Sequence, residues 1–124
     1  MVLLVVEDDQ AMRSLLCDEL WDMGYRIAEA ADGEEALYQI IHCHPDLILS
    51  DLLMPSGGMD YLARLRTLAP ACPVILMTAF GSAETKAEAL QKGVAAYFDK
   101  PVRISELKSA IRRVLETNET GRPN

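Results

Sequence analysis

Five polar residues with complementary chemistry follow short apolar runs in this 124-residue sequence. They are Glu7, Asp8, Asp51, Thr78 and Lys100. Carboxylate oxygens are the ligands that Mg²⁺ prefers, and a carboxylate can also attack phosphorus to form an aspartyl phosphate. A lysine ammonium and a threonine hydroxyl are suited to binding phosphoryl oxygens. The set therefore predicts Mg²⁺ binding and phosphoryl transfer to Asp51.

Each of these residues also has a simpler interpretation when it is taken alone. Asp8 could cap a helix, Asp51 could begin a turn, and Thr78 could be a bystander at the end of a strand. Lys100 could be a solvated surface lysine, as most lysines are. We favour a shared site because four separate segments would otherwise have to place these residue types together by chance. A zinc site is not expected, since no histidine or cysteine lies at these positions.

The elements that must position these residues alternate between two hydrophobic patterns, short apolar runs typical of strands and helical spacing typical of helices. Strands are expected at residues 2–6, 25–30, 46–50, 74–77 and 95–98. Helices are expected at about 10–22, from 32–35 to Pro45, and at about 59–68, 82–91 and 104–115. This alternation predicts an α/β fold of the doubly wound, flavodoxin-like type, a five-stranded parallel sheet in strand order 2-1-3-4-5. Ligands bind beyond the carboxyl ends of such strands, where the five polar residues fall.

Length and charge limit the other functions that the chain could have. The length fits one domain, which we place at residues 1–117, with residues 118–124 as a polar tail or the start of a linker. The net charge of -7 argues against direct binding of this domain to nucleic acid or to an anionic membrane. Three cysteines without a zinc-binding spacing, and no visible signal peptide, favour a cytoplasmic protein with reduced thiols.

Four motifs in order resemble those of the bacterial two-component receiver family. They are Glu7-Asp8-Asp9, Asp51-Leu52-Leu53-Met54-Pro55, Thr78-Ala79 and Lys100-Pro101. Each motif is weak alone, but the ordered set is specific, and the resemblance covers about residues 2–116. It implies a phosphorylation-dependent switch rather than an enzyme with a substrate of its own.

The resemblance also implies a role for each residue. Asp51 would accept a phosphoryl group from a phosphohistidine on a sensor histidine kinase. Mg²⁺ would be held by Glu7, Asp8, Asp51 and the backbone carbonyl of Leu53. Lys100 would pair with the acyl phosphate, Thr78 would move to hydrogen-bond it, and Tyr97 would swing inward behind Thr78. Tyr97 could equally be a half-buried strand aromatic.

The implied readout is a change of the face built from the fourth helix, the fifth strand and the fifth helix. This face would contact an output domain or a downstream protein, and it could form a homodimer on activation. The run Thr78–Thr85 looks like receivers attached to enhancer-binding transcription activators, although a hybrid kinase or a free-standing domain is an alternative.

Two features depart from the usual pattern or modify it. The run Ser56–Asp60 differs from the turn that commonly follows Met-Pro in this family, so the shape of that loop is open. Leu53 and Phe80 stand where the family tunes the lifetime of its phosphate, and neither apolar side chain can position an attacking water. Slow self-dephosphorylation, on the order of minutes or longer, is therefore expected.

Two other function classes remain as alternatives. A haloacid-dehalogenase-like phosphatase also forms an aspartyl phosphate on a parallel sheet. It normally has a second aspartate two residues after the nucleophile, where this chain has Leu53. A receiver-like binding module that is not phosphorylated is the other alternative, and the complete set of five polar residues argues against it.

Overall fold

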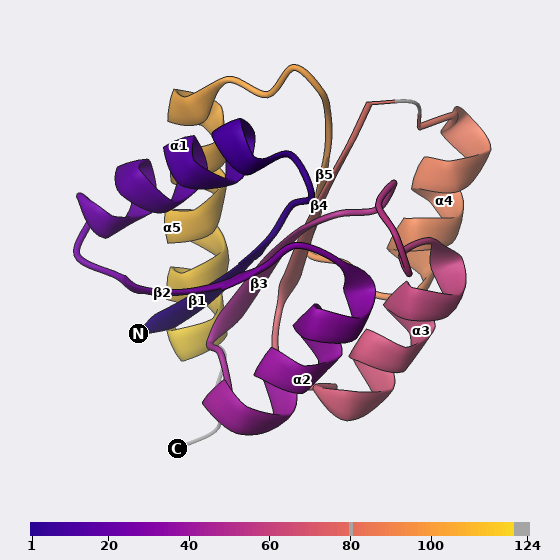
Figure 1. Ribbon diagram of the computed structural model, residues 1–124, viewed down its shortest axis with the longest axis horizontal. Coiled ribbons are helices and arrows are strands. Elements are labelled where there is room, and N and C mark those ends of the chain that lie inside the picture. The colour runs from indigo at the N-terminus through magenta and orange to yellow at the C-terminus, as the bar shows by residue number, and fades with distance from the viewer. Residues whose placement is uncertain (80, 121–124) are drawn as a thin grey trace.

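Strands and helices alternate in the computed structural model, which describes residues 1–79 and 81–120 (Figure 1). The strands are β1 (Val2–Val6), β2 (Arg26–Ala30), β3 (Leu47–Asp51), β4 (Val74–Thr78) and β5 (Ala96–Asp99). The helices are α1 (Gln10–Trp21), α2 (Gly33–Cys43), α3 (Met59–Leu68), α4 (Ala83–Gln91) and α5 (Ile104–Thr120). No helix within the described ranges is long and apolar enough to cross a membrane.

The five strands form one parallel sheet in the order β2-β1-β3-β4-β5, which confirms the predicted doubly wound fold. The register places Val6 of β1 opposite Ser50 of β3, and Asp51 of β3 opposite Met77 of β4. β3, β4 and β5 each end one residue later than the sequence predicts, at a polar residue that adds nothing to the apolar pattern. Asp51 and Thr78 are therefore the last residues of their strands.

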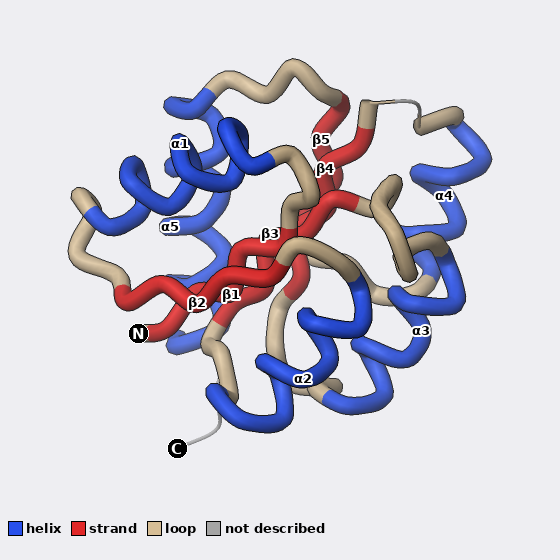
Figure 2. Tube along the Cα trace, viewed as in Figure 1, coloured by secondary structure: helices blue, strands red, loops and turns tan. Residues whose placement is uncertain are grey.

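Two hydrophobic cores lie on opposite faces of the sheet (Figures 1 and 2). Helices α1 and α5 cover one face, and α2, α3 and α4 cover the other. Side chains alternate along β1, so that Leu3 and Val5 enter the core under α1 and α5, while Leu4 and Val6 enter the opposite core. Within α4 only Ala89 is buried, so this helix is held by less apolar packing than the others.

Three helices begin where a polar side chain caps the backbone. Asp9, Asp32 and Ser82 precede α1, α2 and α4. Each side chain accepts a hydrogen bond from the backbone N–H three residues later, at 3.0, 2.8 and 3.1 Å respectively. Such caps satisfy backbone donors that have no partner inside the helix, which is why these helices begin at the predicted positions.

The last helix, α5, continues beyond its expected end at Leu115 to Thr120. The residues from Glu116 onward are polar and lack apolar spacing, so the hydrophobic pattern ends before the helix does. Adding a residue to an existing helix requires no new nucleus, which lets polar residues extend it. The remainder of the expected tail, residues 121–124, lies outside the described residues.

Candidate functional site

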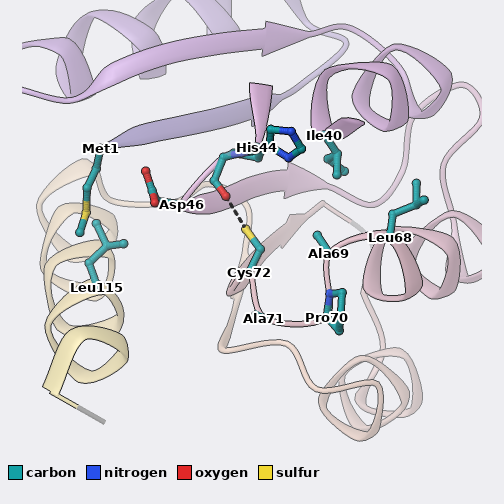
Figure 3. Close-up of a pocket in the computed structure, with 11 residues that line it drawn as sticks. Met1, Ile40, His44, Asp46, Leu68, Ala69, Pro70, Ala71, Cys72 and Leu115 are labelled. Carbon is teal, nitrogen blue, oxygen red and sulfur yellow. Dashed lines mark hydrogen bonds between the residues drawn. The ribbon is translucent and has the colours of Figure 1, made fainter. Parts of the chain in front are cut away.

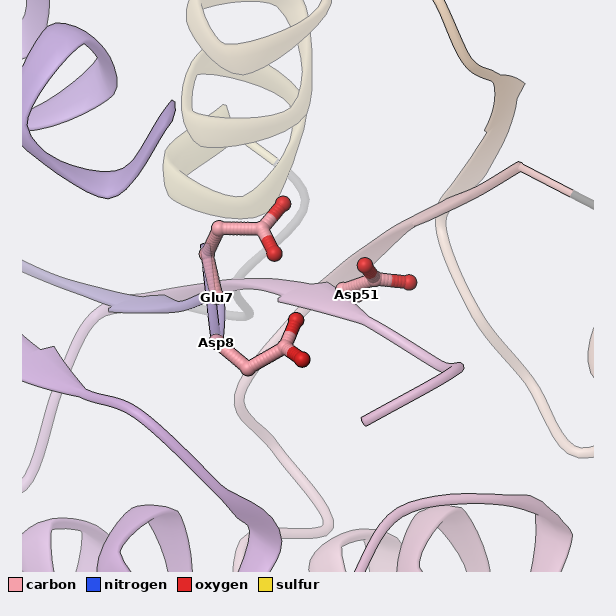
Figure 4. Close-up of side chains that lie close together, drawn as sticks. All are labelled: Glu7, Asp8 and Asp51. Carbon is pink, nitrogen blue, oxygen red and sulfur yellow. The ribbon is translucent and has the colours of Figure 1, made fainter. Parts of the chain in front are cut away.

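Three carboxylates lie together at the carboxyl edge of the sheet (Figure 4). Glu7 and Asp8 follow β1, and Asp51 ends the neighbouring β3. One oxygen atom of each carboxylate lies within 4.8 Å of the other two. Glu7 is fully buried and Asp51 is 4 % exposed, whereas Asp8 is exposed to solvent. The pairing of β1 with β3 thus brings together the three acidic side chains that are predicted from the sequence to bind a metal ion.

Lys100, just after β5, joins two of these carboxylates. Its Nζ donates a hydrogen bond to Oδ2 of Asp51 at 2.7 Å and a second one to Oε1 of Glu7. The backbone N–H of Lys100 donates to the carbonyl oxygen of Thr78 at 2.9 Å, which holds the start of the β5–α5 loop beside the end of β4. One ammonium therefore faces three carboxylates, and the site carries an excess of negative charge.

Burial and charge oppose each other in this cluster. Burial raises the pKa of Glu7, and the hydrogen bonds from Lys100 and from the backbone of Asp9 only partly counter it. Burial alone would lower the pKa of Lys100, but its bonds to the carboxylates of Asp51 and Glu7 outweigh that effect, so the pKa is raised. Lys100 consequently stays protonated at neutral pH and remains the positive partner of the cluster.

Two buried hydroxyls near this edge have no hydrogen-bond partner among the described residues. One is Oγ1 of Thr78, at the end of β4, and the other is the phenol oxygen of Tyr97 in β5. Leaving a buried donor unpaired costs about 1–3 kcal/mol, so an acceptor that reached Thr78 would be bound favourably. The sequence predicts an inward swing of Tyr97, and in this structure its hydroxyl is already inside. Phe80, expected to tune phosphate lifetime, lies outside the described residues.

The loop after β3 is held by the start of α2. The backbone N–H of Gly33 donates to the carbonyl oxygen of Pro55 at 3.0 Å. A β-carbon on Gly33 would lie 1.9 Å from the carbonyl oxygen of Ser56, so the loop can approach this closely only because residue 33 is glycine. The backbone N–H of Leu53 donates to Oδ1 of Asp51 at 3.0 Å, while the Leu53 side chain is 48 % exposed.

Two contacts beside the site involve residues to which the sequence reasoning assigns no role. Nη1 of Arg13 donates to the carbonyl oxygen of Glu7 at 2.7 Å, and its Nε bonds Glu29 at 3.3 Å. The hydroxyls of Ser50 and Tyr61 lie 2.9 Å apart in the core, and burial raises the pKa of Tyr61 to about 12. No spacing in the sequence marks either contact, since both depend on how α1 and α3 pack.

The donor set fits a hard divalent cation. All three clustered side chains offer carboxylate oxygens, which suit Mg²⁺, and the cluster contains no histidine or cysteine. Asp8 is open to solvent, so a cation held here could keep water ligands, as Mg²⁺ prefers. The excess negative charge of the cluster would also be relieved by a divalent cation.

A separate pocket of about 320 Å³ lies at the opposite edge of the sheet (Figure 3). Its lining includes Met1, Asp46 and Cys72, which precede β1, β3 and β4. Asp46 accepts a hydrogen bond from the backbone N–H of Val2 at 2.8 Å, and Sγ of Cys72 donates to the carbonyl oxygen of Pro45 at 3.2 Å. These polar groups are already partnered, and the pocket shares no residue with the acidic cluster.

Comparison with known proteins agrees with this fold. The family described as response regulator receiver domain matches residues 3–112. The chain therefore belongs to the response regulator receiver domains, which are regulatory domains of two-component signalling. Receiver domains generally bind Mg²⁺ at an acidic pocket, and this chain holds an acidic cluster of that kind.

Curated relatives include response regulators and a sensor kinase. The transcriptional regulatory protein ZraR of Salmonella typhimurium is 38% identical over 121 residues, which cover 96% of this chain and 27% of ZraR. The two-component response regulator PhoP of Pseudomonas aeruginosa is 35% identical over 116 residues, 93% of this chain and 52% of PhoP. The sensor histidine kinase RcsC of Escherichia coli is 38% identical over 112 residues, 90% of this chain and 12% of RcsC. The chain thus spans only part of the length of these relatives.

Solved structures show the same architecture. A CheY-like response regulator receiver domain protein from Methanospirillum hungatei superposes with a TM-score of 0.93 at 29% identity, covering 98% of both chains. NtrX from Brucella abortus superposes with a TM-score of 0.88 at 28% identity, covering 97% of this chain and 28% of NtrX.

Proposed function

We propose that this chain is a phosphorylation-dependent switch in which Asp51 accepts a phosphoryl group from the phosphohistidine of a sensor histidine kinase. The observation that carries the proposal is the 2.7 Å contact between Lys100 and Asp51, at an edge that also holds Glu7 and Asp8. It supplies a buried carboxylate nucleophile, a cation for a phosphoryl oxygen and further acidic ligands in one place. Family membership supports the same assignment, because receivers partner with sensor histidine kinases and output domains.

Asp51, Lys100 and Thr78 would each have a role in the phosphoryl transfer reaction. A carboxylate oxygen of Asp51 would attack phosphorus, and the phosphorus–nitrogen bond of the phosphohistidine would break, with its electron pair going to the imidazole nitrogen. Lys100 would then bind a phosphoryl oxygen, and the unpartnered hydroxyl of Thr78 would donate to another. The phosphoryl group places about -1.5 to -2 units of charge beside these donors, in place of the single negative charge of the Asp51 carboxylate.

The ligands that we assign to Mg²⁺ are Glu7, Asp8, Asp51 and the backbone carbonyl of Leu53. Bound Mg²⁺ supplies positive charge that offsets the carboxylates and the incoming phosphoryl oxygens. The chain contributes by holding its ligands in place. Arg13 fixes the carbonyl of Glu7, and the backbone N–H of Leu53 fixes one oxygen of Asp51.

The signal would pass from Thr78 to the face formed by α4, β5 and α5. Movement of Thr78 toward the phosphoryl group would change the space beside Tyr97, whose hydroxyl is also unpartnered. Because Ala89 is the one buried residue of α4, this helix can shift at little cost in packing. Driving the switch from mostly inactive to mostly active requires roughly 5.5 kcal/mol, much of which a few charge-assisted hydrogen bonds can supply.

The partners of this chain follow from the same assignment. A sensor histidine kinase would supply the phosphoryl group, and an output domain or downstream protein would read the altered face. A transcriptional output is favoured because ZraR is named a transcriptional regulatory protein. The likeness to part of RcsC keeps a place within a larger kinase as an alternative.

A labelling experiment tests the proposal. The chain is incubated with radiolabelled acetyl phosphate, with and without Mg²⁺, and compared with Asp51→Asn and with Asp60→Asn. Asp60 is exposed in the first turn of α3 and is a control for loss of one carboxylate. We expect Mg²⁺-dependent labelling of the wild type and of Asp60→Asn, and no labelling of Asp51→Asn.

Two other results of such assays would favour the alternative functions. Absence of labelling in the wild type would favour a binding module that is not phosphorylated. Multiple turnover of a phosphate ester such as p-nitrophenyl phosphate would favour a phosphatase. The proposal predicts no such turnover, because Leu53 offers no acid or base two residues after Asp51.

A further inference from the structure

Gly81 lies in the segment between β4 and α4, where a side chain would collide with two residues of the switch. A β-carbon built on Gly81 would lie 1.7 Å from the phenol oxygen of Tyr97 and 3.0 Å from its Cζ. The same β-carbon would lie 2.7 Å from Cγ2 of Thr78. Real β-carbons essentially never lie under 3.0 Å from unbonded atoms, so the contact with the Tyr97 hydroxyl and the contact with the Thr78 methyl group would both have to be relieved by movement, and the Tyr97 contact is much the shorter.

Tyr97 is the neighbour that can move. Thr78 is 1 % exposed and ends an inner strand that is buried throughout, so its methyl group has no path to solvent. Tyr97 belongs to the edge strand β5 and is partly exposed, so its ring has a path to solvent. Its hydroxyl makes no hydrogen bond with the described residues that would hold it inside. The ring is kept in place by packing against the core under α2, α3 and α4.

We propose that Gly81 is a positioning residue of the switch. Because glycine has no side chain, it leaves room beside Thr78 for the hydroxyl of Tyr97. The inference rests on the proposed function, in that Thr78 and Tyr97 carry the signal from Asp51. A methyl group at residue 81 would displace the ring of Tyr97 toward solvent. We expect the phosphoryl site itself to remain, since the three atoms nearest to that β-carbon belong to Tyr97 and Thr78, and none belongs to Lys100 or to a carboxylate of the acidic cluster.

NMR spectroscopy of the 124-residue chain tests the position of Tyr97 without any phosphorylation. Nuclear Overhauser effects between the Tyr97 ring and the Thr78 methyl group are compared in the wild type and in Gly81→Ala. Tyr97→Phe serves to assign the ring signals. We expect the effect in the wild type and its loss in Gly81→Ala. Retention of the effect in Gly81→Ala would overturn the proposal.

A second arm measures signal transfer. Acetyl phosphate and Mg²⁺ are added, and amide chemical shifts of α4, β5 and α5 are followed together with labelling of Asp51. Gly81→Ala should keep the labelling and lose most of the shift changes at this face. Chemical-shift changes in Gly81→Ala as large as those in the wild type would contradict the proposal. If the wild type were not labelled, the result would count against Asp51 as the phosphoryl acceptor. The NMR result on the position of Tyr97 would not be affected.

The double variant Gly81→Ala/Tyr97→Ala covers the case in which Gly81→Ala does not fold. Removing the ring removes the shortest collision, while the contact with Thr78 is the same in both backgrounds. Gly81→Ala should therefore cost much less free energy of unfolding when Tyr97 is alanine than when it is tyrosine. An equal cost in the two backgrounds would show that Tyr97 is not the residue for which Gly81 makes space.

Discussion

Nζ of Lys100 lies 2.7 Å from Oδ2 of Asp51, although the two residues are 49 positions apart in the sequence. Lys100 also bonds Glu7, so one ammonium holds two buried carboxylates that lie at the carboxyl ends of two neighbouring strands. A phosphoryl group or a cation that enters the site must rearrange these contacts. The stability of the site and its proposed chemistry therefore depend on the same ion pairs.

Replacement of Lys100 by methionine should destabilise the metal-free domain. Two buried carboxylates would lose their positive partner, at a cost of about 2 kcal/mol, which is below the value for fully buried pairs because Lys100 retains some exposure. Added Mg²⁺ should raise the melting temperature of Lys100→Met more than that of the wild type, because it restores positive charge. Thermal unfolding in EDTA and in Mg²⁺ measures both effects. Lys86→Met, an exposed change on α4, is the control, and an equal response to Mg²⁺ in all three proteins would contradict the expectation.

Asp8 and Asp9 provide a matched pair for testing the cation site. Asp8 belongs to the carboxylate cluster, whereas Asp9 caps α1 by accepting a bond from Met12 at 3.0 Å. Both changes to asparagine remove one charge, and asparagine can still cap a helix. Asp8→Asn should weaken Mg²⁺ binding roughly 10-fold or more, and Asp9→Asn should weaken it far less. Isothermal titration calorimetry gives both affinities, and equal losses would mean that only net charge matters.

The main residues of the site can be predicted from the order of strands and polar residues along the sequence, because a parallel sheet brings the carboxyl ends of its strands to one edge. Glu7, Asp51 and Thr78 could therefore be selected from apolar runs and the polar residues after them. The requirement for glycine at position 81 could not be predicted, because it depends on where the ring of Tyr97 in β5 lies relative to Thr78 in β4. The loop at Ser56 likewise depends on a close contact with Gly33 that no local pattern records.

The lifetime of the phosphorylated state depends on water at the acyl phosphate. Leu53 is apolar and 48 % exposed, so it cannot orient water for attack. The wild type should lose its phosphoryl group with a half-life on the order of minutes or longer. Leu53→Asn should lose it faster, because an amide can position water. Phosphate release after removal of the phosphodonor measures both rates, and a wild-type half-life of seconds would refute the prediction.

Arg66 should anchor the carboxyl-terminal end of α4. Its guanidinium donates to the backbone carbonyl oxygens of Cys72, Lys92 and Pro70 at 2.9, 3.2 and 3.3 Å. Arg66→Met should lower the free energy of unfolding by about 1 kcal/mol, since the partly buried carbonyl oxygens of Cys72 and Lys92 lose their partner. Hydrogen exchange at residues 89–95 should become faster. Arg64→Met, at an exposed position of α3, is the control, and equal exchange in the two variants would exclude the anchor.

The three cysteines should differ in reactivity. Burial, reinforced by the nearby Glu29, raises the pKa of Cys17 to about 12, and burial raises the pKa of Cys72 to about 11. Cys43 is exposed. Because iodoacetamide reacts with the thiolate, a raised pKa slows labelling at pH 8, and the rate should increase as the pH rises. Peptide mass spectrometry should find Cys43 modified first, and labelling of Cys17 as fast as Cys43 would contradict this order.

Chemical identification of the phosphorylated residue tests the central claim most directly. The chain is phosphorylated with acetyl phosphate and Mg²⁺ and reduced with borohydride, which converts an aspartyl phosphate into homoserine, and its peptides are sequenced by mass spectrometry. We expect homoserine at position 51 and at no other aspartate, and we expect its formation to require Mg²⁺. Homoserine at a different aspartate, or none in a chain that binds Mg²⁺, would contradict the assignment of Asp51 as the phosphoryl acceptor.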